Sequence, residues 1–276
     1  MNPHAASATS PIAMGGSIWH YRSLIKQMTW REIVGRYKGS IFGLAWSFFN
    51  PLMMLAVYTF VFSVVFKARW GIETSESKTD FALVLFLGLI IHALFAEVLN
   101  RAPALILSNA NYVKKVVFPL EILTVVSLGA ALFHAAISFL VFLVAFFVLN
   151  GLPSWTVIYT PLTLLPLLPL TLGLGWLLTS LGVYLRDIGQ IIGITTMALL
   201  FLAPVFYPLT ALPEAYQSFL YINPLTYPIE QTRAVIILGE MPNWVGLGVY
   251  TIFSVLICWI GFWWFQRTRR GFADVL

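Results

Sequence analysis

The residues that most often carry chemistry are few in this chain, and they are scattered. The histidines are His4, His20, His92 and His134, and the single cysteine is Cys258. No H-E-x-x-H, C-x-x-C or G-x-x-x-x-G-K-[ST] pattern occurs, so the sequence has neither a zinc or redox motif nor a phosphate-binding P-loop. We therefore expect no catalytic residue, no metal site and no cofactor bound by this chain.

His134 lies inside a long apolar run, where a histidine can act as a proton relay. A lone histidine in a helix is more often a hydrogen-bonded packing residue, and we favour that interpretation. Asp and Glu are missing from the middle of every long apolar run. Because an ion-coupled transporter needs such titrating groups, proton or sodium coupling is disfavoured, as are an intramembrane protease and a glycosyltransferase.

Aromatic side chains are a second class of candidate ligand-binding residues. A helix with aromatic rings facing a pore would offer flat apolar faces to the C–H faces of sugar rings. Anchoring at the membrane interface, or packing against neighbouring helices, is the alternative role for each of them. The candidates for lining a channel are Trp46, Phe49, Tyr58, Phe201, Phe206 and Tyr207.

The composition predicts the kind of protein that positions these side chains. Of 276 residues, 59% are hydrophobic and 10% are charged, whereas about a quarter of a typical soluble domain is charged. A membrane helix needs roughly 20 apolar residues to cross a hydrocarbon core about 30 Å thick. The apolar runs predict an all-α integral membrane protein with six spans at 44–66, 81–99, 122–149, 157–184, 188–207 and 244–265.

The distribution of charge predicts the orientation. Most of the 16 Lys and Arg residues fall in segments on the same side as the two chain ends, so both termini are expected in the cytoplasm. We expect a disordered tail over 1–17 and a six-helix transmembrane domain over 41–266, followed by a cytoplasmic tail over 267–276. Residues 18–40 combine an apolar stripe with basic residues, which predicts an amphipathic helix at the cytoplasmic interface. A solvated basic linker is the alternative.

The outer region 208–243 is too interrupted by proline to span a membrane. Two short re-entrant helices and a plain outer loop are both open interpretations. We find no internal repeat between the first three and the last three spans, which weakens an assignment as a secondary transporter built from repeats.

Six local strings stand out along the chain. They are Arg36–Trp46 (RYKGSIFGLAW) with Asn50-Pro51, Asn111–Glu121 (NYVKKVVFPLE), Arg186-Asp187-Ile188, Phe206-Tyr207-Pro208, Asn223-Pro224-Leu225 and Leu238-Gly239. Each string alone is weak, but together and in this order they resemble one family, the membrane (permease) subunits of polysaccharide and O-antigen export ABC transporters, within the type-2 ABC exporters. Drug-exporting relatives share the six-span plan but usually lack the Arg-Tyr-Lys of the first string and the Phe-Pro-Leu-Glu of the second.

The resemblance implies a homodimer in a bacterial inner membrane, with the first and fifth spans lining a channel. Two separate ATP-binding cassette subunits would bind ATP and Mg²⁺ and drive export of a lipid-linked glycan of O-antigen or capsular type. The resemblance implies no contact with nucleic acid. A drug or small-lipid exporter of the same architecture, and a membrane assembly factor that transports nothing, remain the alternatives.

The resemblance also implies roles for individual residues. A contact with the ATPase is implied for Asn111, Tyr112, Lys114, Lys115, Arg186 and Asp187. Positive charge that only sets the topology is the alternative for the two lysines, and a simple charged pair in a turn is the alternative for Arg186 and Asp187. Arg31, Arg36 and Lys38 would guide the diphosphate head group of the substrate, or would anchor the chain to anionic lipids.

Overall fold

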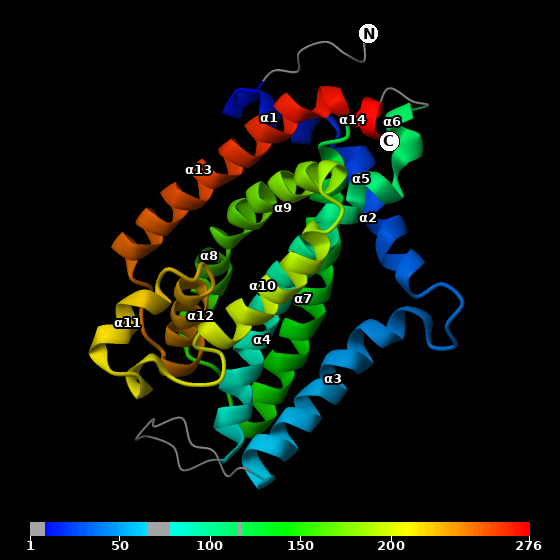
Figure 1. Cartoon of the computed structure of the whole chain (residues 1–276). Coiled ribbons are helices and arrows are strands. Elements are labelled where there is room, and N and C mark those ends of the chain that lie inside the picture. The colour runs from blue at the N-terminus through cyan, green and yellow to red at the C-terminus, as the bar shows by residue number, and fades with distance from the viewer. Residues whose placement is uncertain (1–8, 66–77, 115–117) are drawn as a thin grey trace.

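The computed structural model describes residues 9–65, 78–114 and 118–276, which consist of helices and connecting turns with no β-strand. The helices form an elongated bundle (Figure 1). α1 (Pro11–His20), α2 (Arg22–Arg36) and α14 (Phe272–Val275) gather at one end, while α11 (Glu214–Leu220) and α12 (Thr226–Arg233) lie at the other. The all-α class predicted from the sequence is confirmed.

Among the described residues, five helical segments are long and apolar enough to cross a membrane: Gly43–Phe62, Phe81–Ser108, Ile122–Asn150, Trp155–Tyr184 and Trp244–Val275. They are built on α3 (Trp46–Tyr58), α4 (Lys78–Arg101), α5 (Leu105–Ser108), α7 (Ile122–Asn150), α8 (Thr160–Leu164), α9 (Leu167–Tyr184) and α13 (Trp244–Thr268). These segments correspond to five of the six predicted spans.

The predicted span 188–207 is shorter in the structure. α10 (Ile188–Leu202) has 15 residues, which rise about 22 Å at 1.5 Å per residue, less than the hydrocarbon core of about 30 Å. The helix ends where Ala203 takes an extended conformation, with φ −92° and ψ 154°. Ala203 precedes Pro204, and a proline disfavours the helical conformation of the residue before it. By helix length alone, α10 therefore does not count as a sixth membrane span.

Polar contacts hold α10 against α4 despite its apolar surface. The ring Nε2 of His92 lies 2.9 Å from the backbone carbonyl of Thr196, and the Thr196 hydroxyl donates to Asn100 Oδ1 at 3.1 Å. Inside a membrane such groups need protein partners, because lipid tails offer none. The contacts therefore set which face of α10 meets α4.

The closest helix packing joins α9 to α13, and glycine makes it possible. A Cβ built on Gly261 would lie 2.0 Å from the backbone oxygen of Gly173, and one built on Gly173 would lie 2.4 Å from the backbone oxygen of Ile257. Small residues at such positions let two membrane helices approach closely and gain van der Waals contact. Replacing either glycine would force α9 and α13 apart.

The prediction of a disordered tail over 1–17 is wrong for residues 11–17, which belong to α1. The Ser10 hydroxyl accepts from the Ala13 N–H at 3.1 Å and caps the helix, and proline at its first position has a φ suited to a helix. The helix lies on α13, where Trp259 Nε1 donates to the Thr9 carbonyl at 3.0 Å. Residues 1–8 lie outside the described residues.

The segment predicted as one amphipathic helix over 18–40 is divided between α1 and α2, and its helix ends at Arg36. Its apolar stripe packs on the bundle core. Met28 and Ile33 are buried, and Ile18, Leu24 and Ile25 are packed against buried core residues. The stripe is therefore covered by protein over much of its length.

Candidate functional site

The candidate site is the end of the bundle where α2, α6 (Ala110–Lys114), α14 and the turn between α9 and α10 come together. α2 packs along α7, and α14 contacts both α6 and α9. Most residues singled out for substrate access or ATPase contact lie on these elements.

A square of four charged side chains connects α2 to α4. Arg36 pairs with Glu97 at 2.8 Å, and Arg101 pairs with Glu32 and lies 3.7 Å from Glu97. His134 on α7 joins the group through Nδ1, 3.0 Å from the Glu97 carboxylate. The charges of the two arginines and the two glutamates balance each other. Much of the positive charge that would let Arg36 attract a diphosphate is therefore neutralised.

The sequence analysis missed this square, although its spacing is visible. Glu32 precedes Arg36 by four residues, and Glu97 precedes Arg101 by four residues. Such pairs usually stabilise a single helix. Here the strong pairs cross between helices, because packing brings the two i,i+4 pairs face to face. His134 is hydrogen-bonded, as expected for a packing residue.

Arg31 links α2 to the segment predicted to contact the ATPase. Its guanidinium donates to the Tyr112 hydroxyl at 3.0 Å. The Tyr112 ring stacks on Phe118 with centroids 4.4 Å apart and planes 12° apart. Arg31 and Tyr112 were predicted for separate roles, and the structure places them in direct contact.

Glu121 ties the C-terminal segment to the rest of this end. Its buried carboxylate accepts from Arg269 at 2.9 Å and from the Ser17 hydroxyl at 2.9 Å. Arg269 also donates to the Phe118 carbonyl at 2.9 Å. Phe272 in α14 is fully buried. The segment 267–276, predicted only as a cytoplasmic tail, is therefore packed onto the bundle.

The remaining predicted contact residues lie on the surface, at the end of α6 or outside the described residues. Asn111, Arg186, Asp187 and Lys38 are exposed. Arg186 and Asp187 do not appear among the ion pairs of the described residues, and Asp187 precedes α10 without a side-chain capping bond. Lys114 ends α6, and Lys115 lies outside the described residues.

The channel-lining candidates do not form one cluster. Trp46 and Phe49 are exposed near the start of α3, and each packs edge-on against Phe42. Phe201 stacks on Phe206 with centroids 5.5 Å apart, next to the end of α10.

Two further candidates are held by neighbouring protein. The Tyr207 hydroxyl donates to the Phe201 carbonyl at 3.0 Å. Tyr58 packs against the buried cluster around Leu83 and Phe142. This packing favours the alternative role for Tyr58, as a structural aromatic residue.

Arg233, near the end of α12, is a further residue whose role no sequence pattern indicated. The residue is 4% exposed, and its guanidinium donates to three backbone carbonyls, Val84 (3.1 Å), Val205 (3.1 Å) and Pro204. It also pairs with Glu230 at 3.2 Å. Arg233 thus fixes the chain after α10 against α4 and α12.

Comparison with known proteins identifies relatives over nearly the whole chain. The chain is 26% identical over 259 residues to the O-antigen export system permease protein RfbA of Myxococcus xanthus, covering 93% of this chain and 96% of that protein. It is 24% identical over 254 residues to a Klebsiella pneumoniae protein of the same name, covering 92% and 95%. It is 24% identical over 234 residues to the polysialic acid transport protein KpsM of Escherichia coli, covering 84% and 88%.

The family assignment agrees with the architecture. Long apolar helices make this a multi-pass membrane protein. α2, which carries Arg36, α6, which carries Tyr112, and α14 of the docked C-terminal segment all lie at one end of it (Figure 1). Residues 23–237, well over half of the chain, match the family described as ABC-2 type transporter. The chain belongs to the ABC-2 type transporter family.

Proposed function

We propose that this chain is the permease subunit of an ABC transporter that exports a lipid-linked polysaccharide, of O-antigen or capsular type, across a bacterial inner membrane. The observation that carries the proposal is the match along almost the full length of permeases named for O-antigen export. The chain itself has no P-loop, so ATP and Mg²⁺ would be bound by a separate ATPase subunit.

The positions of the first and last helices favour six membrane crossings over five. α1 and α14 lie at the same end of the bundle (Figure 1), and an even number of crossings is needed to return the chain to the side where it began. α10 would be the additional crossing. Its helix is short, but the chain goes on in a non-helical conformation through the buried residues Ala203 and Val205, and Arg233 donates to the carbonyls there. Covered backbone of this kind is tolerated at membrane depth.

The orientation of the chain in the membrane follows from the end of the bundle that carries most basic residues. The end that carries α2 and α6 would face the cytoplasm, as the positive-inside rule predicts. α11 and α12 would then lie on the outer side as short re-entrant helices. α12 is buried against α4 and α8, whereas α11 exposes Tyr216 and Phe219.

Two copies would enclose the channel between α3 and α10. The Gly43–Phe62 segment, which contains α3, is the least buried of the five long apolar segments. Only 11% of its most apolar residues are buried inside the protein, against 78% for the Phe81–Ser108 segment. α10 also has a large exposed apolar face. The exposed residues on the two helices include Leu52, Met53, Val57, Ile191, Ile194 and Met197.

The ATPase would dock on α6 and on the turn at Arg186 and Asp187, which are exposed at the cytoplasmic end. Asn111, Tyr112, Lys114 and Lys115 would supply the first contact. α14 packs beside α6, so the C-terminal segment would form part of the same surface.

Arg31 and Lys38 would guide the diphosphate head group toward the membrane, with Arg36 contributing from the charge square. Arginine and lysine attract phosphate through charge-assisted hydrogen bonds. The contact of Arg31 with Tyr112 would connect head-group binding to the ATPase surface.

The test is to purify the tagged chain from its native membrane, to identify any ATPase that co-purifies with it, and to reconstitute both in liposomes. ATP hydrolysis is measured with and without a lipid-linked glycan extract from the producing cells. Stimulation by the extract, and not by an extract from cells lacking the glycan, supports the proposal. A stable complex whose ATPase responds only to drugs or phospholipid favours the alternative exporter. Purification with no ATPase favours the assembly factor.

A further inference from the structure

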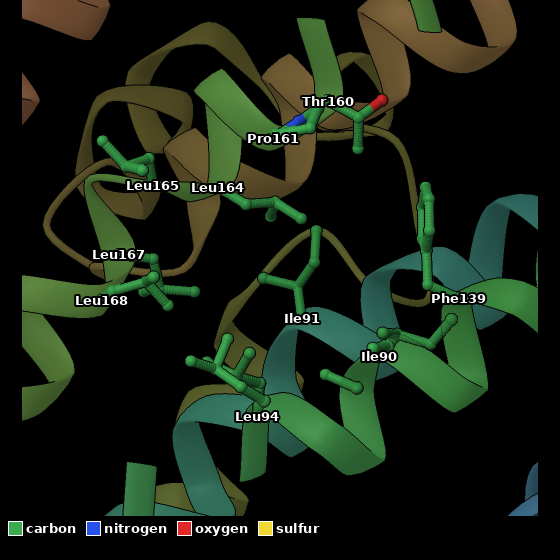
Figure 2. A pocket seen from close by; sticks show the side chains of 13 residues that line it. Ile90, Ile91, Leu94, Phe139, Thr160, Pro161, Leu164, Leu165, Leu167 and Leu168 are labelled. Carbon is green, nitrogen blue, oxygen red and sulfur yellow. The ribbon is translucent and has the colours of Figure 1, made fainter. Parts of the chain in front are cut away.

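An apolar crevice lies between α4, α7, α8 and α9. Its volume is about 300 Å³. Figure 2 shows Ile91 reaching toward Leu164 across it, with Phe139 at one side. Of the 13 lining residues, only Thr160 has a polar side chain. The walls are therefore hydrocarbon almost throughout.

The sequence explains why the crevice is there. Pro166 separates α8 from α9, because proline removes an intrahelical hydrogen bond and displaces the preceding turn. Opposite the break, α7 presents Ala135 and Ala136, which are too small to fill the space. Leu165 lines the crevice and is 57% exposed, so the crevice opens to the outside of the bundle.

The depth of the crevice follows from its position along the helices. Ile91 lies ten residues after Phe81, the start of its apolar segment, which is about 15 Å along the helix. Ala135 lies near the middle of α7. In a hydrocarbon core about 30 Å thick, both positions are close to the midplane. At this depth the surroundings of the opening are lipid tails.

We propose that the crevice is a binding site for one acyl chain of a bilayer phospholipid. An engineered apolar cavity of about 150 Å³ binds benzene, so this space suits a chain of roughly ten to twelve carbons. The acyl chain restores the dispersion contacts that an empty crevice would lack. The walls carry no charged residue to hold a head group, so the head group stays in the interface while the tail fills the site.

The site is tested with a phosphatidylethanolamine that carries a diazirine in one acyl chain. The full transporter is reconstituted with this lipid, extracted, washed in detergent and then illuminated, so that only retained lipid is crosslinked. The labelled peptides are identified by mass spectrometry. Ala136→Phe fills the crevice, and Val144→Phe, on the same helix at a 57% exposed position outside the crevice, is the matched control.

We expect retained label on residues 132–139 and 160–168, a severalfold loss in A136F and no loss in V144F. Label that survives unchanged in A136F overturns the proposal, as does labelling spread equally over exposed positions such as Val148. If A136F does not elute as a single species, Ala136→Leu makes the same test with less added volume. Stronger retention of a polyprenyl phosphate with the same diazirine would assign the site to a carrier lipid and overturn the phospholipid assignment.

Discussion

The Arg36 guanidinium of α2 lies 2.8 Å from the Glu97 carboxylate of α4. Glu97 also contacts Arg101 and His134, so one carboxylate connects three helices. In the proposed transporter, this contact would join α2, the segment proposed to meet the substrate head group, to the membrane core. Through this contact, head-group binding at α2 and the position of α2 against α4 would influence each other.

Glu97→Gln should loosen α2 from the bundle. The amide cannot balance the charges of Arg36 and Arg101, and we expect a loss of about 1–2 kcal/mol, below that of a fully buried pair because these side chains are partly exposed. Thermal unfolding in detergent measures the loss, and trypsin cleavage at Arg36 should become faster. Glu214→Gln, at an exposed position on α11, is the control. Equal stability of the two variants would contradict the structural role of the square.

Tyr112→Phe should uncouple Arg31 from the ATPase surface without removing the ring. The variant keeps the stacking on Phe118 and loses only the hydroxyl that accepts from Arg31. We expect normal assembly with the ATPase and a reduced stimulation of ATP hydrolysis by the glycan extract. Tyr216→Phe, exposed at the opposite end, is the control. Unchanged stimulation in Y112F would show that the contact carries no signal.

Gly261→Ala should prevent normal packing of α9 on α13. The new Cβ would lie 2.0 Å from the Gly173 oxygen, and overpacking of this kind costs about 3 kcal/mol. Gly248→Ala is a matched control on the same helix, since a Cβ there meets nothing within 4 Å. Thermal unfolding of the two variants in detergent compares their stability directly. A G261A protein as stable as G248A would rule out the close approach.

Arg233→Lys should destabilise the connection after α10. A lysine keeps the charge, but its single ammonium cannot reach the carbonyls of Val84 and Val205 together with Glu230. Unpaired buried carbonyls cost about 1–3 kcal/mol. Arg186→Lys, at an exposed site, controls for the substitution itself. The melting temperature should fall only in R233K. An equal fall in both variants would contradict the role of Arg233 in fixing the chain after α10.

Lys114→Glu combined with Lys115→Glu should weaken ATPase assembly while the chain still inserts. The reversed charge would repel an acidic partner surface, whereas two changes alone leave most inner basic residues to set the orientation. Co-purification with the ATPase is the measurement, and Lys26→Glu is the control on the exposed face of α2. Full export by the double variant would remove the docking role.

The long apolar runs predicted where the membrane helices lie, because the length of such a run is dictated by the thickness of the bilayer. The prediction was least accurate at the ends of elements. α10 stops before Pro204, and α1 begins at Pro11 inside a presumed tail. Residues 11–17 were expected in the disordered tail, but they form the first part of α1, which contacts α13.

The sequence by itself determined the class of protein, the places of its helices and the end that gathers basic charge, since these depend on composition and on local patterns. Only the tertiary structure decided which charges are used. Glu97 meets Arg36, Arg31 meets Tyr112, and Arg233 is buried among carbonyls. Each of these contacts joins residues from different helices. Their pairing depends on how the helices cross, and spacing along one chain cannot specify that geometry.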